Sequence, residues 1–207
     1  RAVPYKRPTL IFQRPDVIEP LLEDQTIQLV FAGKAHPEDH AGKQLVQHLW
    51  RMSRRFPQAV AFLPDYDMDL GALLTRGCDV WLNTPQRPLE ASGTSGMKAA
   101  LNGVLNVSVL DGWWPEGVRH GVNGWQIGSG YEGPGQDEQD LVSLIEVLVD
   151  EVIPTFYENP TRWRQMMRES IRLADGRFTS DRMLAEYLNL MYRPAAAIVQ
   201  RSPLFRT

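Results

Sequence analysis

The stretch VWLNTPQRPLEASGTSGMKAALN, residues 80–102, predicts a buried strand, a loop and a helix. Its apolar start, Val80 to Leu82, ends at Asn83-Thr84-Pro85, a combination typical of turns. Small residues from Ser92 to Gly96 follow, and we expect a helix from about Gly96 to Asn102. Backbone N–H groups at such a helix start are accessible to a phosphate or a sugar hydroxyl. The stretch therefore predicts a ligand-binding turn.

The same alternation of strand and helix continues on both sides of this stretch. Short apolar runs that end at turn residues occur at Gln28–Ala32, Ala59–Leu63 and Val104–Leu110, and segments of helical length cover 39–55 and 67–76. Uninterrupted short runs are typical of parallel strands that are buried on both faces. The pattern predicts an α/β fold with a Rossmann-like, doubly wound parallel sheet. Ligands of such folds bind at the carboxyl ends of the strands.

The pattern changes after Gly128, where a glycine-rich loop precedes three helices without strands. Apolar residues recur at helical spacing from Leu141 to Val152, a second helix is expected at about 160–174, and a third from Thr179 to just before Pro194. We therefore expect a single domain overall. Residues 1–128 would form its cofactor- and phosphate-binding core, and 129–207 would be a loop and C-terminal helices that pack on it.

Composition narrows the possible classes of function. The chain has 207 residues and a net charge of −3, without the basic excess typical of nucleic-acid binders, so no nucleic-acid partner is expected. No apolar run approaches the roughly 20 residues that span a bilayer, so no membrane partner is expected. The single cysteine, Cys78, favours a reducing compartment and a cytoplasmic protein. His36 and His40 lack further ligands nearby, so we expect no metal site.

Lys98 is expected in the first turn of the helix that follows the glycine-rich turn. The helix dipole disfavours a cation there, whereas a neutral amine, as in a Schiff base, would fit. On local physics alone, an ordinary exposed lysine beside a turn is the more common explanation of this pattern. The wider motif decides between the two.

The string Glu-Ala-Ser-Gly-x-Ser-x-Met-Lys-x-x-Leu-Asn, from Glu90 to Asn102, resembles the pyridoxal-phosphate attachment signature of the glycogen, starch and maltodextrin phosphorylases. Arg1–Arg7 (RAVPYKR), Gly33-Lys34-Ala35 and Leu63–Tyr66 (LPDY) are similar to further landmarks of that family. The resemblance spans at least Arg1 to Gly128 and points to the short bacterial and archaeal type. It implies the C-terminal domain of a glycosyltransferase-B architecture, whose N-terminal catalytic domain and first strand would precede Arg1.

The resemblance also implies roles for individual residues. Lys98 would hold pyridoxal 5'-phosphate, whose phosphate group takes part in the reaction, and Arg1 and Lys6 would be catalytic contacts to the substrate phosphate. Two neighbouring phosphates repel each other, so cations and oriented N–H groups are needed around them. The implied cofactor-binding residues are Lys98, Tyr66, Thr94, Ser95 and Gly96, and the implied sugar-binding residues are Glu90, Ser92 and Gly93.

The implied activity is that of an α-1,4-glucan phosphorylase, which cleaves α-glucan with inorganic phosphate to α-glucose 1-phosphate with retention. Because the N-terminal domain would complete the cleft, we expect the isolated chain to be inactive. Two alternatives stay open. A nucleotide-sugar glycosyltransferase of the same fold would resemble glycogen synthase, which carries a glutamate at the position of Lys98. A non-catalytic fragment would fold alone or form a homodimer through exposed apolar surface.

Overall fold

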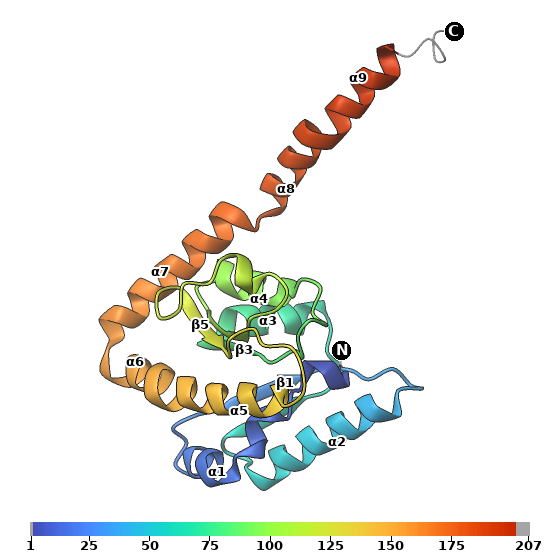
Figure 1. Cartoon of the computed structure of the whole chain (residues 1–207). Coiled ribbons are helices and arrows are strands. Elements are labelled where there is room, and N and C mark those ends of the chain that lie inside the picture. The colour runs from blue at the N-terminus through green and yellow to red at the C-terminus, as the bar shows by residue number, and fades with distance from the viewer. Residues whose placement is uncertain (1, 202–207) are drawn as a thin grey trace.

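The computed structural model describes residues 2–201, which form two parallel sheets with helices around them (Figure 1). In the first sheet, β1 (Leu29–Ala32) pairs with β2 (Val60–Leu63). The second sheet has the order β3-β4-β5 and consists of β3 (Val80–Asn83), β4 (Leu105–Val109) and β5 (Gly124–Ile127). The predicted α/β class with parallel strands is confirmed.

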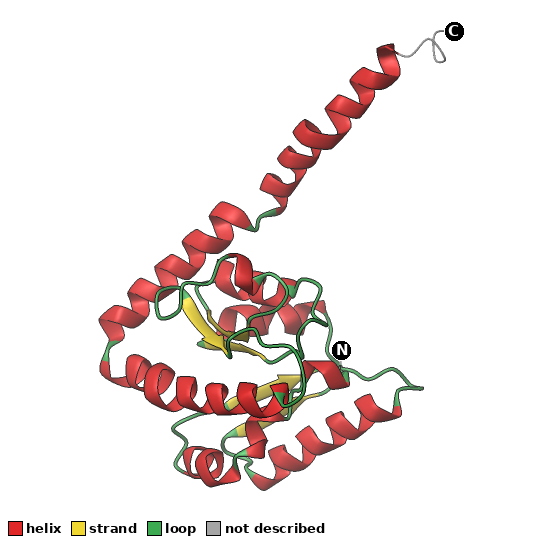
Figure 2. Ribbon diagram, viewed as in Figure 1, coloured by secondary structure: helices red, strands yellow, loops and turns green. Residues whose placement is uncertain are grey.

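Helices follow most strands and continue through the second half of the chain (Figure 2). Asp39 and Asp67 accept hydrogen bonds of 2.8 Å from the N–H groups three residues further on, and these caps start the second and third helices. The α-helices are α1 (Pro15–Glu23), α2 (His40–Arg55), α3 (Met68–Gly77), α4 (Thr94–Leu101), α5 (Gln136–Glu146), α6 (Ile153–Glu158), α7 (Pro160–Arg177), α8 (Ser180–Tyr187) and α9 (Arg193–Arg201). Short 3₁₀ turns cover η1 (Pro4–Lys6), η2 (Leu10–Gln13) and η3 (Trp114–Glu116), and π-helical turns cover η4 (Val147–Val152) and η5 (Leu188–Tyr192).

The main core surrounds β4, all five residues of which are buried. One face of this strand contributes Leu105, Val107 and Val109 to a large apolar cluster that α1 and α5 complete. The other face presents Asn106 and Ser108. The strand is buried on both faces, as predicted, although one of those faces is polar.

Three elements differ from the prediction. β5 was not predicted, because its four residues contain a glycine and a glutamine and give no apolar run. α1 was not predicted, because prolines begin it and lie inside it. The helix expected to end before Pro194 instead continues through η5 into α9, since a proline is tolerated in the first turn of the next helical segment.

The N-terminal segment joins the carboxyl ends of the two sheets. The N–H of Ala2 donates to the carbonyl of Lys34, just beyond β1, over 2.9 Å, and the N–H of Gln86, just beyond β3, donates to the carbonyl of Tyr5 over 2.6 Å. Within residues 2–201, β1 pairs with β2 alone and β3 with β4 alone. Each of these strands therefore has an open edge, and a further strand before Arg1 stays a prediction.

The helices after β5 divide into two groups. α5, η4, α6 and α7 lie on the core, with Leu141, Val152 and Met166 in the main cluster. α8, η5 and α9 extend away from the body as one helical arm (Figure 1). The arm exposes Met183, Leu184, Tyr187, Leu188, Leu190, Met191 and Tyr192. No helix in the described part of the chain combines the length and apolarity needed to cross a membrane.

Candidate active site

The glycine-rich turn after β3 forms the start of α4. Gly93 precedes the helix with φ 83°, a left-handed conformation that favours glycine. Gly96 is required for a different reason, because a Cβ there would lie 2.7 Å from Asn106 Oδ1 and 2.9 Å from Trp113 Nε1. Asn106 also donates to the Gly96 carbonyl over 3.1 Å. These contacts hold the first turn of α4 close to β4.

The start of α4 presents a row of backbone donors. Within residues 2–201, the structure gives no protein acceptor for the N–H groups of Ser92, Gly93, Thr94 and Ser95. The first N–H groups of a helix have no partner inside it and attract anions. Residues 92–95 therefore form a helix start with open N–H groups, and its binding of an anion or a hydroxyl stays a prediction.

Lys98 lies on α4 but not where it was predicted. The helix begins at Thr94, so Lys98 is its fifth residue and belongs to its last turn. The expectation of a first-turn lysine is wrong because the left-handed Gly93 allows the helix to begin two residues before Gly96. The helix dipole consequently gives no reason for a neutral amine at Lys98. Its side chain is exposed and accessible to a ligand.

Lys6 and Glu90 form an ion pair beside this helix start. Glu90 is only 9% exposed, so its carboxylate is buried beneath the protein surface. Burial alone would lower the pKa of Lys6, but the hydrogen bond and the negative charge of Glu90 outweigh it and raise the pKa above its ordinary value. The Lys6 ammonium also lies 5.1 Å from the centre of the Tyr5 ring. Lys6 is therefore held as a cation.

Asp111 ties the loop that follows β4 to the loop that carries Glu90. Its carboxylate accepts hydrogen bonds from the N–H groups of Glu90, at 2.8 Å, and Gly112, at 2.9 Å. The N–H of Trp113 donates to the Ser92 carbonyl over 2.9 Å. Both loops follow neighbouring strands, so their meeting at one sheet edge is a property of the fold. Asp111 thus shapes the turn that holds Glu90.

The remaining predicted residues lie around this cluster or outside it. Tyr66 directly precedes α3, which packs on α4, and its hydroxyl lies against Gly71. Arg1 lies outside the described residues. The structure thus brings together Lys6, Glu90 and the α4 start, with Lys98 on the same helix.

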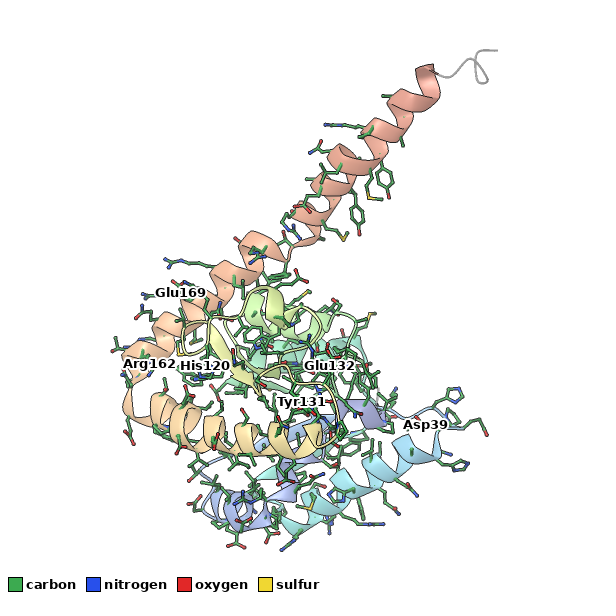
Figure 3. The ribbon with its side chains drawn as sticks, in the orientation of Figure 1. Asp39, His120, Tyr131, Glu132, Arg162 and Glu169 are labelled. Carbon is green, nitrogen blue, oxygen red and sulfur yellow. The ribbon has the colours of Figure 1, made fainter. Side chains whose placement is uncertain are left out.

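Sequence reasoning missed the ion pairs of two arginines that border the cluster. Arg7, next to Lys6, makes ion pairs with Asp137 and Asp140 at the start of α5. Arg87 pairs with Glu132 over 2.6 Å and so ties the loop of residues 129–135 to the loop after β3. Figure 3 labels Tyr131 and Glu132 on the first of these loops. Each contact joins segments at least 45 positions apart, so no local motif could reveal it.

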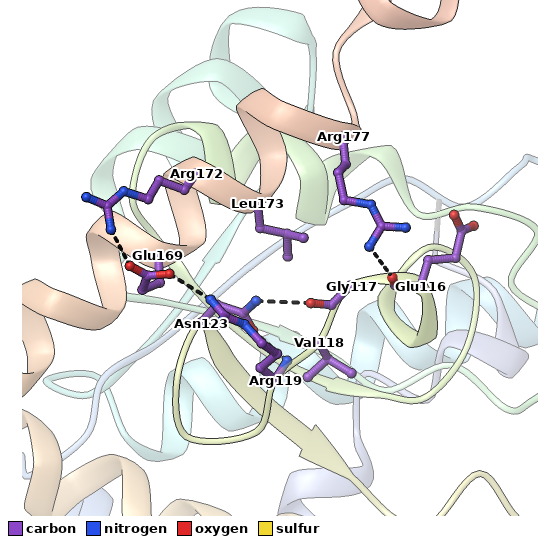
Figure 4. Close-up of a pocket in the computed structure, with 9 residues that line it drawn as sticks. All are labelled: Glu116, Gly117, Val118, Arg119, Asn123, Glu169, Arg172, Leu173 and Arg177. Carbon is purple, nitrogen blue, oxygen red and sulfur yellow. Dashed lines mark hydrogen bonds and ion pairs between the residues drawn. The ribbon is translucent and has the colours of Figure 1, made fainter.

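A separate hollow of about 370 Å³ lies between α7 and the loop before β5 (Figure 4). It contains none of the predicted site residues. Arg119 and Arg172 both pair with Glu169, and Arg177 donates to the Glu116 carbonyl over 2.8 Å. The contacts of Arg119 and Arg177 join α7 to the body, whereas Arg172 and Glu169 pair within α7, so the hollow is explained by helix packing.

Comparison with known proteins agrees with the signature at α4. Residues 18–116 match the family model for carbohydrate phosphorylases. The chain is 45% identical to the maltodextrin phosphorylase of Thermococcus litoralis over 204 residues, which cover 95% of this chain and 24% of that protein. It is 45% identical to the glycogen phosphorylase of Mycobacterium tuberculosis, covering 98% of this chain and 25% of that one, and 44% identical to that of Aquifex aeolicus, covering 93% and 29%.

Residues 18–116 match the carbohydrate phosphorylase family, and nearly the whole chain is similar to members of that family. Among the members it matches, its likeness is to glycogen and maltodextrin phosphorylases, and it spans about a quarter of their length. The resemblance drawn from the Glu90–Asn102 signature is therefore confirmed.

Solved structures share the fold. Anabaena Alr3699/HepE in complex with UDP superposes with a TM-score of 0.63 at 23% identity, over 92% of this chain and 47% of that one. The same protein with UDP and glucose gives a TM-score of 0.64 at 22% identity, over 91% and 46%. This likeness concerns the fold, which is the glycosyltransferase-B fold.

Proposed function

We propose that this chain is the part of an α-1,4-glucan phosphorylase that binds pyridoxal phosphate and contributes contacts to phosphate and sugar. One observation carries the proposal. The signature from Glu90 to Asn102 folds into a helix start with four open N–H groups beside the Lys6–Glu90 pair. This signature lies within residues 18–116, which match the family.

The residues present suit a phosphorylated cofactor. Lys98 offers an exposed amine, and the first turn of α4 offers the N–H groups of Thr94 and Ser95 to a phosphate, whereas the N–H of Gly96 donates to the Gly93 carbonyl over 3.1 Å. Tyr66 precedes the helix that packs on α4, which supports its proposed place beside the cofactor. When bound, pyridoxal phosphate would supply a phosphate group that exchanges a proton with the substrate phosphate.

The chain's own residues would bind and orient the substrates. Lys6 would leave Glu90 and bind the inorganic phosphate, and Glu90 would accept a hydrogen bond from a sugar hydroxyl. The N–H groups of Ser92 and Gly93 would donate to the same sugar. In the longer protein, Arg1 would add a second cation against the phosphate, since neighbouring phosphates repel each other strongly. The products would be α-glucose 1-phosphate, with retained configuration, and a shortened α-glucan.

The proposal includes a partner and a compartment. The rest of the longer protein, including an N-terminal domain, would complete the cleft. We therefore propose that this chain alone is inactive. The single cysteine, half-buried Cys78, suits the cytoplasm. A nucleotide-sugar transferase is less well supported, because a lysine stands at position 98 and the likeness to HepE concerns the fold.

Cofactor attachment can be tested on this chain, which has only four lysines: Lys6, Lys34, Lys43 and Lys98. Incubation with pyridoxal phosphate and reduction with borohydride should give one pyridoxyl adduct, at Lys98, by peptide mass spectrometry. Lys98→Ala should remove it, and the exposed-lysine control Lys43→Ala should keep it. Equal labelling of Lys34 and Lys43, or labelling that survives Lys98→Ala, would contradict the proposal.

Activity needs a separate assay. Maltodextrin and phosphate should yield α-glucose 1-phosphate with the full-length parent protein and none above background with this chain. Turnover by the chain alone would refute its proposed dependence on the rest of the protein.

A further inference from the structure

Arg7 adopts an unusual backbone conformation directly after Lys6. Its φ of 42° and ψ of 48° are left-handed, a region that residues other than glycine rarely occupy. Its side chain is only 8% exposed although it carries a charge. Such a residue persists only where the surrounding contacts hold it, and this directs attention to those contacts.

The Arg7 guanidinium binds two segments at once. On one side it donates to the backbone carbonyls of Thr84, at 2.9 Å, and Pro85, at 2.7 Å. On the other side it donates to the carboxylates of Asp137 and Asp140, both at 2.6 Å. One side chain therefore links the loop after β3 to the first turns of α5.

The backbone around Lys6 is fixed to the same loop in the reverse direction. The hydroxyl of Thr84 donates to the carbonyls of Lys6, at 3.1 Å, and Arg7, at 3.0 Å. The N–H of Gln86 donates to the carbonyl of Tyr5 over 2.6 Å. This loop continues directly to Glu90. The position of the Lys6 ammonium relative to the Glu90 carboxylate thus depends on the contacts between residues 5–7 and 84–86.

We infer that Arg7 is a positioning residue, whose guanidinium sets the Lys6–Glu90 pair in place at the α4 start and ties that pair to α5. Arg7 contacts neither end of the pair itself and acts through the backbone of both segments. The inference rests on the proposed function in so far as Lys6 and Glu90 are ligand-binding groups. A lysine could not replace Arg7, because an ammonium lacks the planar fork that reaches two carbonyls and two carboxylates together.

A purely structural role for Arg7 must be separated from a positioning role. Asp140 is buried, and burial raises its pKa despite the hydrogen bond and charge of Arg7. Removal of Arg7 alone would leave this carboxylate without its partner and destabilise the fold. A loss of stability would therefore not distinguish the two roles. Two variants avoid this difficulty: Arg7→Lys keeps a cation, and the double variant Arg7→Met, Asp140→Asn removes both charges.

The pKa of Lys6 is the sensitive measurement. Reductive ¹³C-methylation of the four lysines gives resolvable NMR signals, and each can be titrated in the folded chain at a temperature where all variants show native circular dichroism. The groups that face Lys6 are Glu90 and Tyr5. Both variants should lower the pKa of Lys6, because loss of the Glu90 contact leaves burial as the dominant influence. Arg119→Met, a distant ion-pair control, should leave the pKa of Lys6 unchanged.

A second measurement relates the geometry to ligand binding. Inorganic phosphate, titrated by calorimetry, should bind both Arg7 variants at least about tenfold more weakly than the wild type. This is the effect expected from the loss of one charge-assisted hydrogen bond. An unchanged Lys6 titration in both variants would overturn the positioning role of Arg7. A lowered Lys6 pKa with unaltered phosphate affinity would uphold the positioning of the pair and instead count against Lys6 as the phosphate contact of the proposed function.

Discussion

Glu169 shows how one carboxylate is tuned by its neighbours. It accepts hydrogen bonds from Arg119 and Arg172, and these lower the pKa of Glu169, with Arg119 as the larger cause. A carboxylate whose pKa is lower in the folded than in the unfolded protein stabilises the fold above its ordinary pKa. That contribution is lost as the pH falls through the folded value. The ion pair that joins α7 to the loop before β5 should therefore stabilise the fold less in acid.

The prediction concerns Glu169→Gln. At pH 7 the variant should unfold at a lower urea concentration than the wild type, and the difference should shrink as the pH falls below the ordinary value of 4.5. Glu186→Gln, which removes the exposed pair with Arg182 on the arm, is the matched control and should behave as the wild type. A difference for Glu169→Gln that stayed constant with pH would disprove the electrostatic explanation.

At the scale of single residues, the local sequence was enough to identify site residues whose partners lie nearby in the chain. The signature placed Glu90, Ser92 and Lys98 on one turn and one helix. It misjudged the helix start, because Gly93 adopts a left-handed conformation that lets the helix begin at Thr94. Arg7 is part of the Arg1–Arg7 motif, but its carboxylate partners lie on a helix that begins at Gln136. No spacing rule in the sequence connects these two segments.

Single glycines fix how the elements around the site meet. Gly112 has φ 59°, and a Cβ there would lie 2.4 Å from the carbonyl oxygen of Ser92. The loop after β4 can thus approach the start of α4 only if residue 112 has no side chain. Gly176 near the end of α7 is the opposite case, because an added Cβ would meet nothing within 4 Å.

These two glycines make a matched pair of substitutions. Gly112→Ala should destabilise the chain by about 1–3 kcal/mol, from backbone strain and the clash with Ser92, and should reduce pyridoxyl labelling of Lys98. Gly176→Ala should be neutral or stabilising by up to about 1 kcal/mol, since alanine is the better helix former. Urea unfolding and the labelling assay give both quantities. Equal stability of the two variants would contradict the role of close approach at Gly112.

Elements were predictable where their pattern was continuous. The runs that became β1 to β4 were apolar and ended at turn residues, and α2 and α3 began at aspartate caps. β5 is held by its pairing with β4 and by buried Trp125, and neither is visible in a four-residue segment. Tertiary packing, rather than local propensity, forms that strand.

The helical arm of residues 180–201 dominates the shape of the whole molecule (Figure 2). Its helices make their main contacts with one another, whereas Phe178 just before it packs edge-on against Trp113 with ring centres 4.9 Å apart. The sequence predicted helices in this region but could not show that their apolar side chains lie away from the body. Helical spacing identifies the apolar face of a helix but not the surface that packs against that face.

Removal of residues 180–207 should leave the melting temperature of the body within about 2 °C of the full chain, because the arm's packing is largely its own. Phe178→Ala should instead cost about 1–3 kcal/mol, since it opens the cluster around Trp113 and Trp114. Calorimetry of both variants, with light scattering to follow association, is the measurement. A large drop in melting temperature on truncation would mean that the arm packs on the body in solution.

The hydrogen bonds of Arg7 also determine when the site can form. They join residues that are 77, 78, 130 and 133 positions apart, and the two longest require the start of α5. On a ribosome, Lys6 and Glu90 would both have been synthesised well before Asp140 could neutralise Arg7. Contacts this distant in sequence are costly to close and slow to form. The carboxyl end of the sheets, where the proposed site lies, should therefore be the last region to become protected from hydrogen exchange during folding.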